Sequence, residues 1–426
     1  MKNLRAFVLC FFPIVLGLLA AEGCKKEPPV KPEISERVKL TLIDVAVKEA
    51  YLHITVSSPA ANETLSLQRN GTTVMTFAAV ADTSIADTAL AQTTPYVYTA
   101  TVQTNTLTGK SNTITAQTLA PTSHGFTWET VLLGDGNGSA LYDVALINDT
   151  LAYAVGEIYL SGDPTRYNAA IWNGDSWTIQ RIPYYYQGQP FYNPIQTVFA
   201  FSHDDIWFAG NGLVHWNGQQ YIPVDVSSVW GPYPINRIWG DAGEIWIVGE
   251  GGSIAHRNVS GTWRRLESGT TTSILDAWGI VNPVSTATAV YCVASNIFGN
   301  GDTKILKITA GTHVDSLQWI GRLLTGVWTH SGFPLHMSGD GVFENARGEW
   351  REVPTGVYTN DIRGTSLNNI VAVGDFGFIM HFNGMDWQVV GSDATAGYAT
   401  VRVRDDLVVA IGRKNARGLI TIGRRQ

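Results

Sequence analysis

Charged side chains are scarce in this chain of 426 residues, because Asp, Glu, Lys and Arg together make up only 15% of it. The 36 acidic residues outnumber the 29 basic ones, which leaves a formal net charge of −7, and no basic run follows the first residues. Proteins that bind DNA or RNA carry a basic patch, so nucleic acid is excluded as a partner. With 45% hydrophobic residues, the chain is not a disordered tail protein either.

Cysteine is also nearly absent, with three residues in the chain. Cys10 lies in an apolar run, residues 6–21, that follows a basic N-terminus, and this is the layout of a signal peptide. At about 16 residues the run is shorter than the roughly 20 that a spanning helix needs. Cys292 lies in an apolar segment and is expected to be a buried small hydrophobe.

The third cysteine, Cys24, follows the small residues Ala21 and Gly23 at the end of the apolar run. This segment resembles the lipobox of bacterial lipoproteins. The resemblance implies that residues 1–23 are a cleaved lipoprotein signal peptide and that Cys24 carries the lipid. Cys292 then has no partner for a disulfide bond. The alternative is ordinary secretion, with no role for Cys24.

Tryptophan is missing from the first part of the chain, because all 14 Trp residues lie between Trp128 and Trp387. This change in composition predicts a domain boundary near Pro121, between folded regions at 38–121 and 122–426. Residues 24–37 are rich in proline and charge and lack apolar periodicity, so they are expected to form an extended tether.

Region 38–121 has the pattern of a β-sandwich. Apolar and polar residues alternate at 51–56 and 96–102, with a turn signal at Asn70-Gly71. His53 lies among the polar positions and is expected at the surface. The segment 90–102, with Pro95 before Tyr-Val-Tyr, resembles the E-to-F corner and F strand of fibronectin type III domains, which implies a small Ig/fibronectin III-like sandwich.

Region 122–426 contains a repeat in which an apolar strand ends in glycine and a polar residue. Most copies continue to a turn followed by an aromatic residue, as in Asn383-Gly384 with Trp387. Seven copies in 305 residues give about 44 residues per repeat, which is the length of a four-stranded propeller blade. The polar residues after the strand ends, counting one degenerate copy, are Glu157, Asn211, Glu250, Asn296, Asp340, Asp375 and Arg413.

The two ends of this region complement each other. The last repeat, from Tyr398, provides three strands, and residues 125–131 look like its missing fourth strand, so the N- and C-terminal strands are expected to pair and leave no open edge. The motifs Trp-Gly, apolar-Val-Gly-Asp and aromatic-Asn-Gly-x-x-Trp resemble those of the BNR-like and photosystem-assembly-factor-like propeller families. The resemblance implies an all-β chain with a seven-bladed β-propeller, a fold that says little about activity.

Few residues in the repeats suggest chemistry. A ring of acids after the strand ends could bind a cation, but Asp and Asn are also the residues that tight turns require, so no metal and no cofactor are expected. His215, His256 and His381 recur once per repeat and cannot share one metal, so a structural role is expected for them.

Arg237, Arg363 and Arg402 fall in or beside one column of the first strands and could face the centre as a clamp for a carboxylate. Sialidase-type enzymes resemble this region in their repeated aromatic turn, but their Ser-x-Asp-x-Gly-x-x-Trp box is missing. No paired catalytic carboxylates can be assigned. The protein is therefore not expected to be an enzyme, and a glycoside-acting enzyme is kept as an alternative.

Aromatic residues gather in two adjacent connections, 182–194 and 230–234, which are expected to be loops on the face that also carries the end of the first repeat's second strand. Aromatic residues held by proline can stack on sugars or anchor a protein. They could instead cap the blades or pack on the sandwich. The candidate binding residues are Tyr159, Tyr167, Tyr184, Tyr185, Tyr186, Phe191, Tyr192, Trp230 and Tyr233.

These features predict a monomeric, lipid-anchored protein of the bacterial cell envelope. Its propeller is expected to bind a glycan or a protein, with the membrane contacted only through the lipid on Cys24. A periplasm-facing assembly or scaffold factor for envelope complexes is the main alternative.

Overall fold

The computed structural model describes residues 37–103, 108–136, 138–186, 189–296, 302–309, 311–319, 321–346 and 348–426. The predicted signal peptide, Cys24 and all of the predicted tether except Arg37 lie outside these residues. The described part is all-β, with one 3-10 turn, η1 (Glu250–Gly252). No helix within these ranges is long and apolar enough to cross a membrane.

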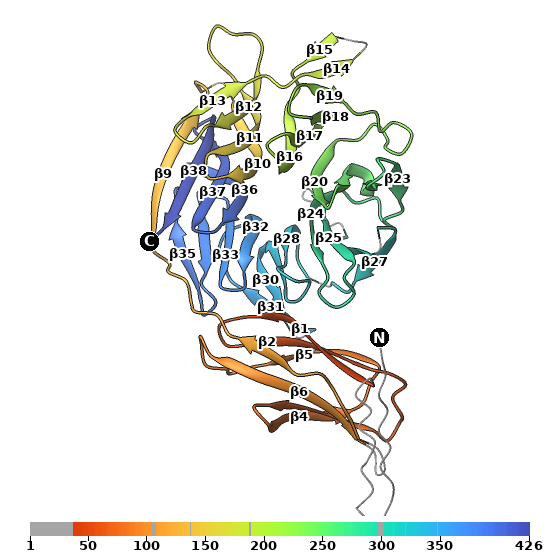
Figure 1. Cartoon of the computed structure of the whole chain (residues 1–426). Coiled ribbons are helices and arrows are strands. Elements are labelled where there is room, and N and C mark those ends of the chain that lie inside the picture. Colours follow the sequence, from red (N-terminus) through yellow and green to blue (C-terminus); the bar gives the residue numbers. More distant parts are fainter. Residues whose placement is uncertain are drawn as a thin grey trace, which may run out of the picture.

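The first region forms two antiparallel sheets around one apolar core (Figure 1). One sheet has the order β1-β2-β5, and the other has the order β4-β3-β6-β7 with β8 beside β6. Alternate residues such as Leu52, Ile54 and Leu67 are fully buried between the sheets. The strands are β1 (Val38–Val45), β2 (Ala50–Val56), β3 (Thr64–Arg69), β4 (Thr72–Ala78), β5 (Asp82–Asp87), β6 (Pro95–Gln103), β7 (Thr108–Lys110) and β8 (Ile114–Gln117).

His53 is buried, so the prediction that it lies at the surface was wrong. It lies on β2, the central strand of its sheet, where Ser84 and Asp82 of β5 cover it. Its Nδ1 is 3.0 Å from the Ser84 hydroxyl, and its Nε2 is 2.5 Å from the Asp82 carboxylate. Alternation marks the side of a strand on which a residue lies, but not whether that side is covered.

Cys292 is fully buried, as predicted.

The second region contains seven four-stranded antiparallel sheets in its described residues. The first is β10 (Ala140–Asn148), β11 (Leu151–Ile158), β12 (Tyr167–Trp172) and β13 (Trp177–Gln180); the second is β16 (Ile195–Ser202), β17 (Asp205–Gly210), β18 (Leu213–Trp216) and β19 (Tyr221–Pro223). The third is β20 (Ile235–Asp241), β21 (Glu244–Gly249), β22 (Ile254–Arg257) and β23 (Trp263–Leu266); the fourth is β24 (Ile274–Val281), β25 (Thr288–Ala294), β26 (Lys304–Thr309) and β27 (His313–Leu317).

The fifth sheet is β28 (Leu324–Trp328), β29 (Leu335–Gly339), β30 (Gly341–Asn345) and β31 (Trp350–Val353); the sixth is β32 (Thr359–Ser366), β33 (Asn369–Gly374), β34 (Ile379–Phe382) and β35 (Trp387–Gly391). The seventh combines β36 (Ala396–Arg404), β37 (Leu407–Lys414) and β38 (Arg417–Arg425) with β9 (Phe126–Leu133) from the start of the region. Thr130 of β9 lies opposite Thr421 of β38.

The seven sheets are arranged around a central axis, as in a β-propeller (Figure 1). The first strand of each sheet contacts the first strand of the next, and β36 of the seventh sheet contacts β10 of the first. Aromatic residues of one sheet pack on glycines of the next. A Cβ atom on Gly279 would lie 2.4 Å from the Trp239 ring, and one on Gly364 would lie 2.9 Å from the Trp328 ring, so this close packing requires glycine at both positions.

The connection between the first and second sheets, predicted to be a loop, contains a short hairpin. β14 (Tyr184–Tyr186) pairs with β15 (Gln189–Phe191), so that Tyr184 lies opposite Phe191 and Tyr185 opposite Pro190. Proline is tolerated there because β14 and β15 form a sheet of two strands, both of them edges. The prediction that this connection contains no strand was therefore wrong for β14 and β15.

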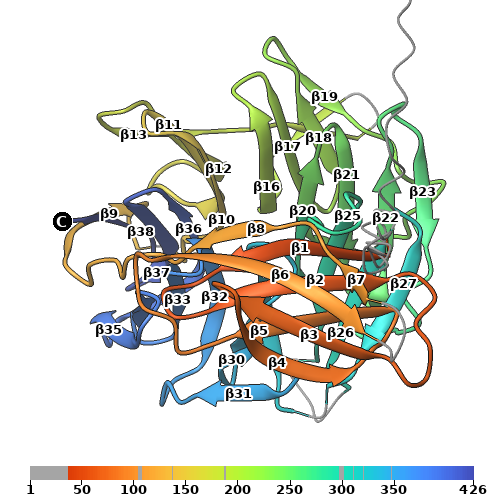
Figure 2. The ribbon, with the colours of Figure 1, turned by 60° about the horizontal axis from the view of Figure 1, so that its bottom comes forward.

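The sandwich packs on the fifth and sixth sheets (Figures 1 and 2). Tyr51 of β2 is 1% exposed, belongs to the same apolar cluster as Trp328, and meets the Phe333 ring edge-on with 5.4 Å between centroids. The Asp44 carboxylate accepts a hydrogen bond from the Ser331 hydroxyl at 2.7 Å and lies 2.9 Å from Nδ1 of His330. The two regions therefore share an apolar interface with a polar clasp at its edge.

The clasp between Asp44 and His330 makes the stability of this interface pH-dependent. The hydrogen bond to Asp44 raises the pKa of His330 above its ordinary value of 6.5. The stabilisation that protonated His330 gives the interface is therefore complete below pH 6.5 and is lost as the pH rises through the raised pKa of His330. As the pH rises above the ordinary pKa of 6.5, we expect the melting temperature to fall by more in the native chain than in His330→Gln. Equal falls in calorimetric scans of the two proteins would contradict this assignment.

Candidate functional site: a funnel lined by seven bulged residues

The first strand of every propeller sheet carries a β-bulge near its start. The register with the second strand slips there by one residue in all seven sheets. Each extra residue is half-buried, while its neighbours on both sides are buried. Because a bulge turns one side chain away from its normal direction, the seven sheets present one such residue each to the axis. The bulged residues are Tyr142, Gln196, Asn236, Leu275, Thr325, Asn360 and Ala399.

The glycine that ends the second strand makes room for this bulge. A Cβ atom on Gly374 would lie 2.0 Å from the carbonyl oxygen of Tyr358, and one on Gly156 would lie 2.2 Å from that of Ala140. The same holds, at 2.0 to 2.9 Å, for Gly210, Gly249, Gly339 and Gly412. The recurring glycine of the sequence repeat thus has a structural reason beyond ending the strand. The fourth sheet has Ala294 at this place.

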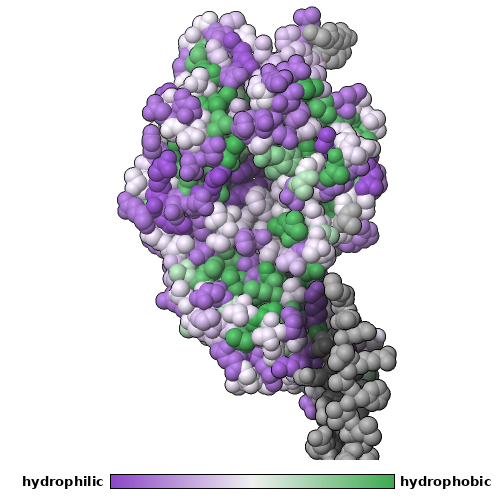
Figure 3. All heavy atoms as spheres, viewed as in Figure 1, coloured by the Kyte–Doolittle hydropathy of each residue, from purple (hydrophilic) through white to green (hydrophobic). Residues whose placement is uncertain are grey.

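All seven bulged residues line one cavity of about 1430 Å³ at the axis, which we call the funnel. Figure 3 shows the surface hollowed at the middle of the ring of sheets. Several wall residues also tie neighbouring sheets together: the side chains of Asn236, Thr325 and Asn360 donate hydrogen bonds of 2.8 to 3.0 Å to backbone carbonyls of the next sheet. The wall is therefore polar, positioned by the bulges, and held in place by contacts between sheets.

The rim of the funnel is acidic. Turn residues predicted from the repeat lie there, around the funnel and an adjoining cavity of about 680 Å³ that shares Tyr142, Asn360 and Ala399 with it. Arg322 is already paired with Glu352. The negative charges of the rim come from Glu157, Glu250, Asp340 and Asp375, and its positive charges come from Arg322 and Arg413. Asn211, in contrast, lies outside both cavities, beside the β14–β15 hairpin.

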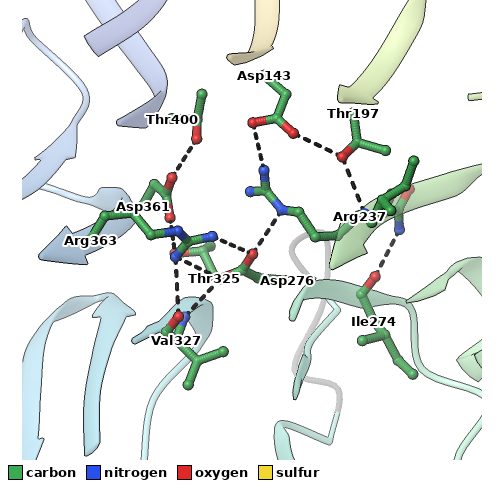
Figure 4. Close-up of polar contacts among 12 residues, drawn as sticks. Asp143, Thr197, Arg237, Ile274, Asp276, Thr325, Val327, Asp361, Arg363 and Thr400 are labelled. Atoms are coloured by element: carbon green, nitrogen blue, oxygen red, sulfur yellow. Dashed lines mark hydrogen bonds and ion pairs between the residues drawn. The ribbon is translucent and has the colours of Figure 1, made fainter. Parts of the chain in front are cut away.

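A closed ring of six ion pairs, which we call the ion-pair ring, lies directly below the funnel. Figure 4 shows the part of it that runs from Asp143 through Arg237, Asp276 and Arg363 to Asp361. Three buried aspartates alternate in it with three arginines. Arg237 lies 2.9 Å from Asp143 and 2.8 Å from Asp276; Arg363 lies 2.7 Å from Asp276 and from Asp361; Arg402 lies 3.3 Å from Asp361 and 2.7 Å from Asp143. The ring is neutral and links five of the seven sheets across the axis.

The ion-pair ring keeps Asp143 and Asp276 charged although both are fully buried. Burial raises the pKa of Asp143, but the guanidinium groups of Arg237 and Arg402 lower that pKa by more. Burial likewise raises the pKa of Asp276, and Arg363 and Arg237 more than offset it. Thr197 adds a 2.8 Å hydrogen bond to Asp143. Asp143 and Asp276 are therefore ionised at neutral pH.

The three arginines predicted as a carboxylate clamp do lie at the centre, but their partners are the protein's own aspartates. Arg237 belongs to the same layer as the aspartates, whereas Arg363 and Arg402 lie two residues further along their strands. The aspartates were missed, although Asp143, Asp276 and Asp361 share one register position, directly after the bulge. That shared position is the signal that could have found them.

The predicted aromatic residues fall into three groups. Tyr184 and Trp230 are each 7% exposed and cap the sheets, with the Trp230 indole donating to the Tyr233 carbonyl at 2.8 Å. Tyr159 and Tyr167 are half-buried, each with an arginine over its ring: Arg166 and Arg181. Exposed rings remain at Tyr185, Phe191 and Tyr233, 44 to 47% exposed, while Tyr192 is half-buried and Tyr186 belongs to β14.

A cavity of about 600 Å³ lies between the β14–β15 hairpin and the second sheet, with Tyr184, Tyr185 and Phe191 on its wall. The sandwich packs on the fifth and sixth sheets, so these aromatic residues do not pack on it. The hairpin cavity and the funnel share no lining residue.

The repeated histidines have structural contacts. His215 stacks on Trp207 and His256 on Trp246, with 4.3 and 4.4 Å between ring centroids. His381 is fully buried, and burial lowers its pKa to about 3. Within the described residues, no three His, Cys, Asp or Glu side chains come together as a metal site would require.

Comparisons with known proteins find the fold but no family. No protein-family model and no curated protein matches the chain. Among solved structures, the chain is similar to YCF48 with a bound D1 peptide, at 15% identity over 72% of this chain and 99% of that one, with a TM-score of 0.54. Raptor from Chaetomium thermophilum matches at 9% identity over 70% of this chain and 29% of that one, with a TM-score of 0.51.

A third solved structure, PorZ, a surface component of the type-IX secretion system of Porphyromonas gingivalis, matches at 12% identity over 89% of this chain and 60% of that one, with a TM-score of 0.49. At these identities the likeness concerns the fold alone. Together with the four-stranded sheets, the likeness to YCF48 shows that the second region is a β-propeller.

Proposed function

We propose that this protein is a binding module of the bacterial cell envelope whose funnel holds a segment of a partner protein. The observation that carries the proposal is the wall of seven bulged residues, one from each sheet, around a cavity of about 1430 Å³. Small-molecule sites measure about 300 to 1,000 Å³, so the funnel suits a longer ligand. The side-chain amide of Gln196 and the amide oxygens of Asn236 and Asn360 offer hydrogen bonds of the kind that pair with a peptide backbone.

The rim favours a partner segment that is basic. Its exposed carboxylates at Glu250, Asp340 and Asp375 attract positive charge. Phe376, 60% exposed at the edge of the adjoining cavity, has a φ of 57°, which is an outlier for a bulky residue and offers an apolar contact. The propeller of YCF48, which shares the fold, is seen with a bound peptide.

The same proposal includes the parts of the chain that carry the propeller. Residues 1–23 act as the lipoprotein signal peptide, and Cys24 holds the lipid. The sandwich is fibronectin III-like, which its strand order and the 2.9 Å hydrogen bond from the Ala91 amide to the Tyr96 hydroxyl support. The seven sheets act as seven blades closed by β9, with the chain as a monomer. A scaffold role for envelope complexes is a form of this proposal.

Photocrosslinking inside cells tests the funnel. We place benzoylphenylalanine at Leu275, on the funnel wall, at Tyr185, on the hairpin, and at Val259, which is 71% exposed on the third sheet's outer turn. The expected result is a protein adduct from position 275 but none from 259. Reversing the rim charge by Glu250→Lys with Asp340→Lys should reduce the adduct several-fold, whereas Glu267→Lys on an outer strand end should leave it unchanged. No adduct at 275 contradicts the proposal.

Glycan binding by the aromatic hairpin is a second candidate function. The cavity of about 600 Å³ beside Tyr185 and Phe191 supports it, because exposed aromatic rings stack on sugar faces. An adduct at position 185 but not at 275, or glycan binding that is lost in Tyr185→Ala with Phe191→Ala, would favour this candidate over the funnel.

A further inference from the structure

A second cavity, of about 280 Å³, lies at the axis on the other side of the ion-pair ring. The funnel is lined by residues that precede the ring aspartates on the first strands, whereas this cavity is lined by residues that follow them, such as Ala145, Val198 and Trp278. Arg237 lines both cavities, alone among the described residues. We call this cavity the lower pocket, and it opens on the face opposite to the funnel.

The lower pocket exists because one sheet lacks a large side chain. Two residues after the ring layer, the first strands carry Phe199, Trp239, Trp278, Trp328, Arg363 and Arg402 in six sheets. The first sheet has Ala145 at this position. The small side chain leaves open the space that an aromatic ring or a guanidinium group takes in the other sheets.

The lining of the lower pocket combines aromatic rings with positive charge. Phe199, Trp239 and Trp278 lie on its wall together with the arginines Arg237, Arg363, Arg402 and Arg404, and the rest of the lining is aliphatic. Among the residues that the structure describes, none that lines the pocket is acidic. Arg237, Arg363 and Arg402 are neutralised within the ion-pair ring, and Arg404 adds one positive charge at the edge of an otherwise apolar surface, which fits a planar group that carries a negative charge.

Two of these arginines have capacity left for a ligand. Arg404 is outside the ion-pair ring, is 42% exposed at the side chain, and bonds the Ile147 carbonyl; the Asp149 carboxylate is 4.0 Å from it and 77% exposed. Nε of Arg363 is buried without a hydrogen-bond partner, and its guanidinium group lies 5.2 Å over the Trp278 ring.

We propose that the lower pocket binds a small aromatic carboxylate. The ring of the ligand stacks among Phe199, Trp239 and Trp278, and its carboxylate takes hydrogen bonds from Arg404 at the mouth of the pocket. The volume, just below the usual range of about 300 to 1,000 Å³, limits the ligand to a single-ring group. The ion-pair ring separates this site from the funnel, so it stands independently of the proposed protein partner.

The test uses 4-fluorobenzoate as the probe, followed by fluorine NMR on the purified full chain in detergent. We expect a saturable shift with a dissociation constant of about 1 mM or lower, and binding at least about tenfold weaker for 4-fluorobenzamide, which has the same shape without the charge. No saturable shift up to about 10 mM benzoate, or equal affinities for acid and amide, overturns the proposal.

Three variants locate the binding. Ala145→Phe gives the first sheet a ring at the position where other sheets already hold one, and it should abolish binding while near-ultraviolet circular dichroism stays native. Arg404→Gln should weaken binding about fivefold or more, and Arg265→Gln, which removes the same charge from the outer strand β23, should not change it. Unchanged binding in Ala145→Phe or in Arg404→Gln overturns the proposal, and Arg404→Gln decides alone if Ala145→Phe does not fold.

Discussion

Replacing Asp276 by asparagine is expected to lower the free energy of unfolding of the propeller by about 3 to 5 kcal/mol. The carboxylate is fully buried and lies 2.7 Å from Arg363 and 2.8 Å from Arg237. It also accepts the Val327 amide at 2.9 Å. Asparagine keeps the shape of the side chain but removes its negative charge. The ion-pair ring then holds three arginines and two aspartates, so one buried positive charge is left uncompensated beside Arg237 and Arg363.

The matched control for this prediction is Asp406→Asn. Asp406 also pairs with an arginine, Arg425, but its side chain is 68% exposed, so its loss should cost less than about 1 kcal/mol. Urea unfolding followed by tryptophan fluorescence reports on the propeller alone, because every Trp lies between residues 128 and 387. If both variants lose the same stability, the ion-pair ring contributes no more than a surface pair.

Acid should remove the same stabilisation. The pKa values of Asp143 and Asp276 lie below the ordinary 3.8 in the folded state, so their contribution is complete above that value and is lost as the pH falls through the lowered pKa. The native chain should therefore lose stability more steeply below about pH 4 than Asp276→Asn does, since the variant has one such carboxylate fewer. Parallel acid curves would assign the acid response to other groups.

The sequence predicts the propeller well because its signals are local and repeated. A glycine that ends a strand, as at Gly374, and an aromatic residue after a turn, as at Trp387, recur in most sheets, and both have geometric causes in the structure. The glycine meets the carbonyl beside the bulge, and Trp387 pairs with Phe382 on the neighbouring strand. Because each sheet must meet these geometric requirements by itself, the same type of residue recurs at the same position in most of the sheets.

The funnel wall, in contrast, cannot be recognised from a repeated residue in the sequence. The bulged position holds seven side chains of six different types, from Tyr142 to Ala399, because the backbone slip, and not the side chain, is what every sheet repeats. The ion-pair ring is also hidden, since its six members come from five sheets and become neighbours only when the sheets surround the axis. Sequence reasoning found the three arginines as a column but could not see which carboxylates face them.

Replacing Gly412 by alanine is the other change with a large expected effect, a loss of about 3 kcal/mol, at the upper end of what overpacking costs. Gly412 of β37 lies opposite Tyr398, next to the bulged Ala399. A Cβ atom there would lie 2.0 Å from the Gly397 carbonyl oxygen and 2.8 Å from the Tyr398 Cα, so backbone atoms must move. The shift should displace the funnel wall in the seventh sheet, and urea unfolding by tryptophan fluorescence measures its cost.

The control lies in the same sheet. A Cβ atom on Gly397 would meet nothing within 4 Å, and its φ is not in the left-handed region, so Gly397→Ala should be neutral or stabilising by up to about 1 kcal/mol. The fourth sheet sharpens the test, because it holds Ala294 opposite Ile274 and still forms the bulge. A Gly412→Ala variant as mild as Gly397→Ala would mean that the seventh sheet can relax in the same way. A large loss would mean that the bulge in each sheet is fitted to its own glycine.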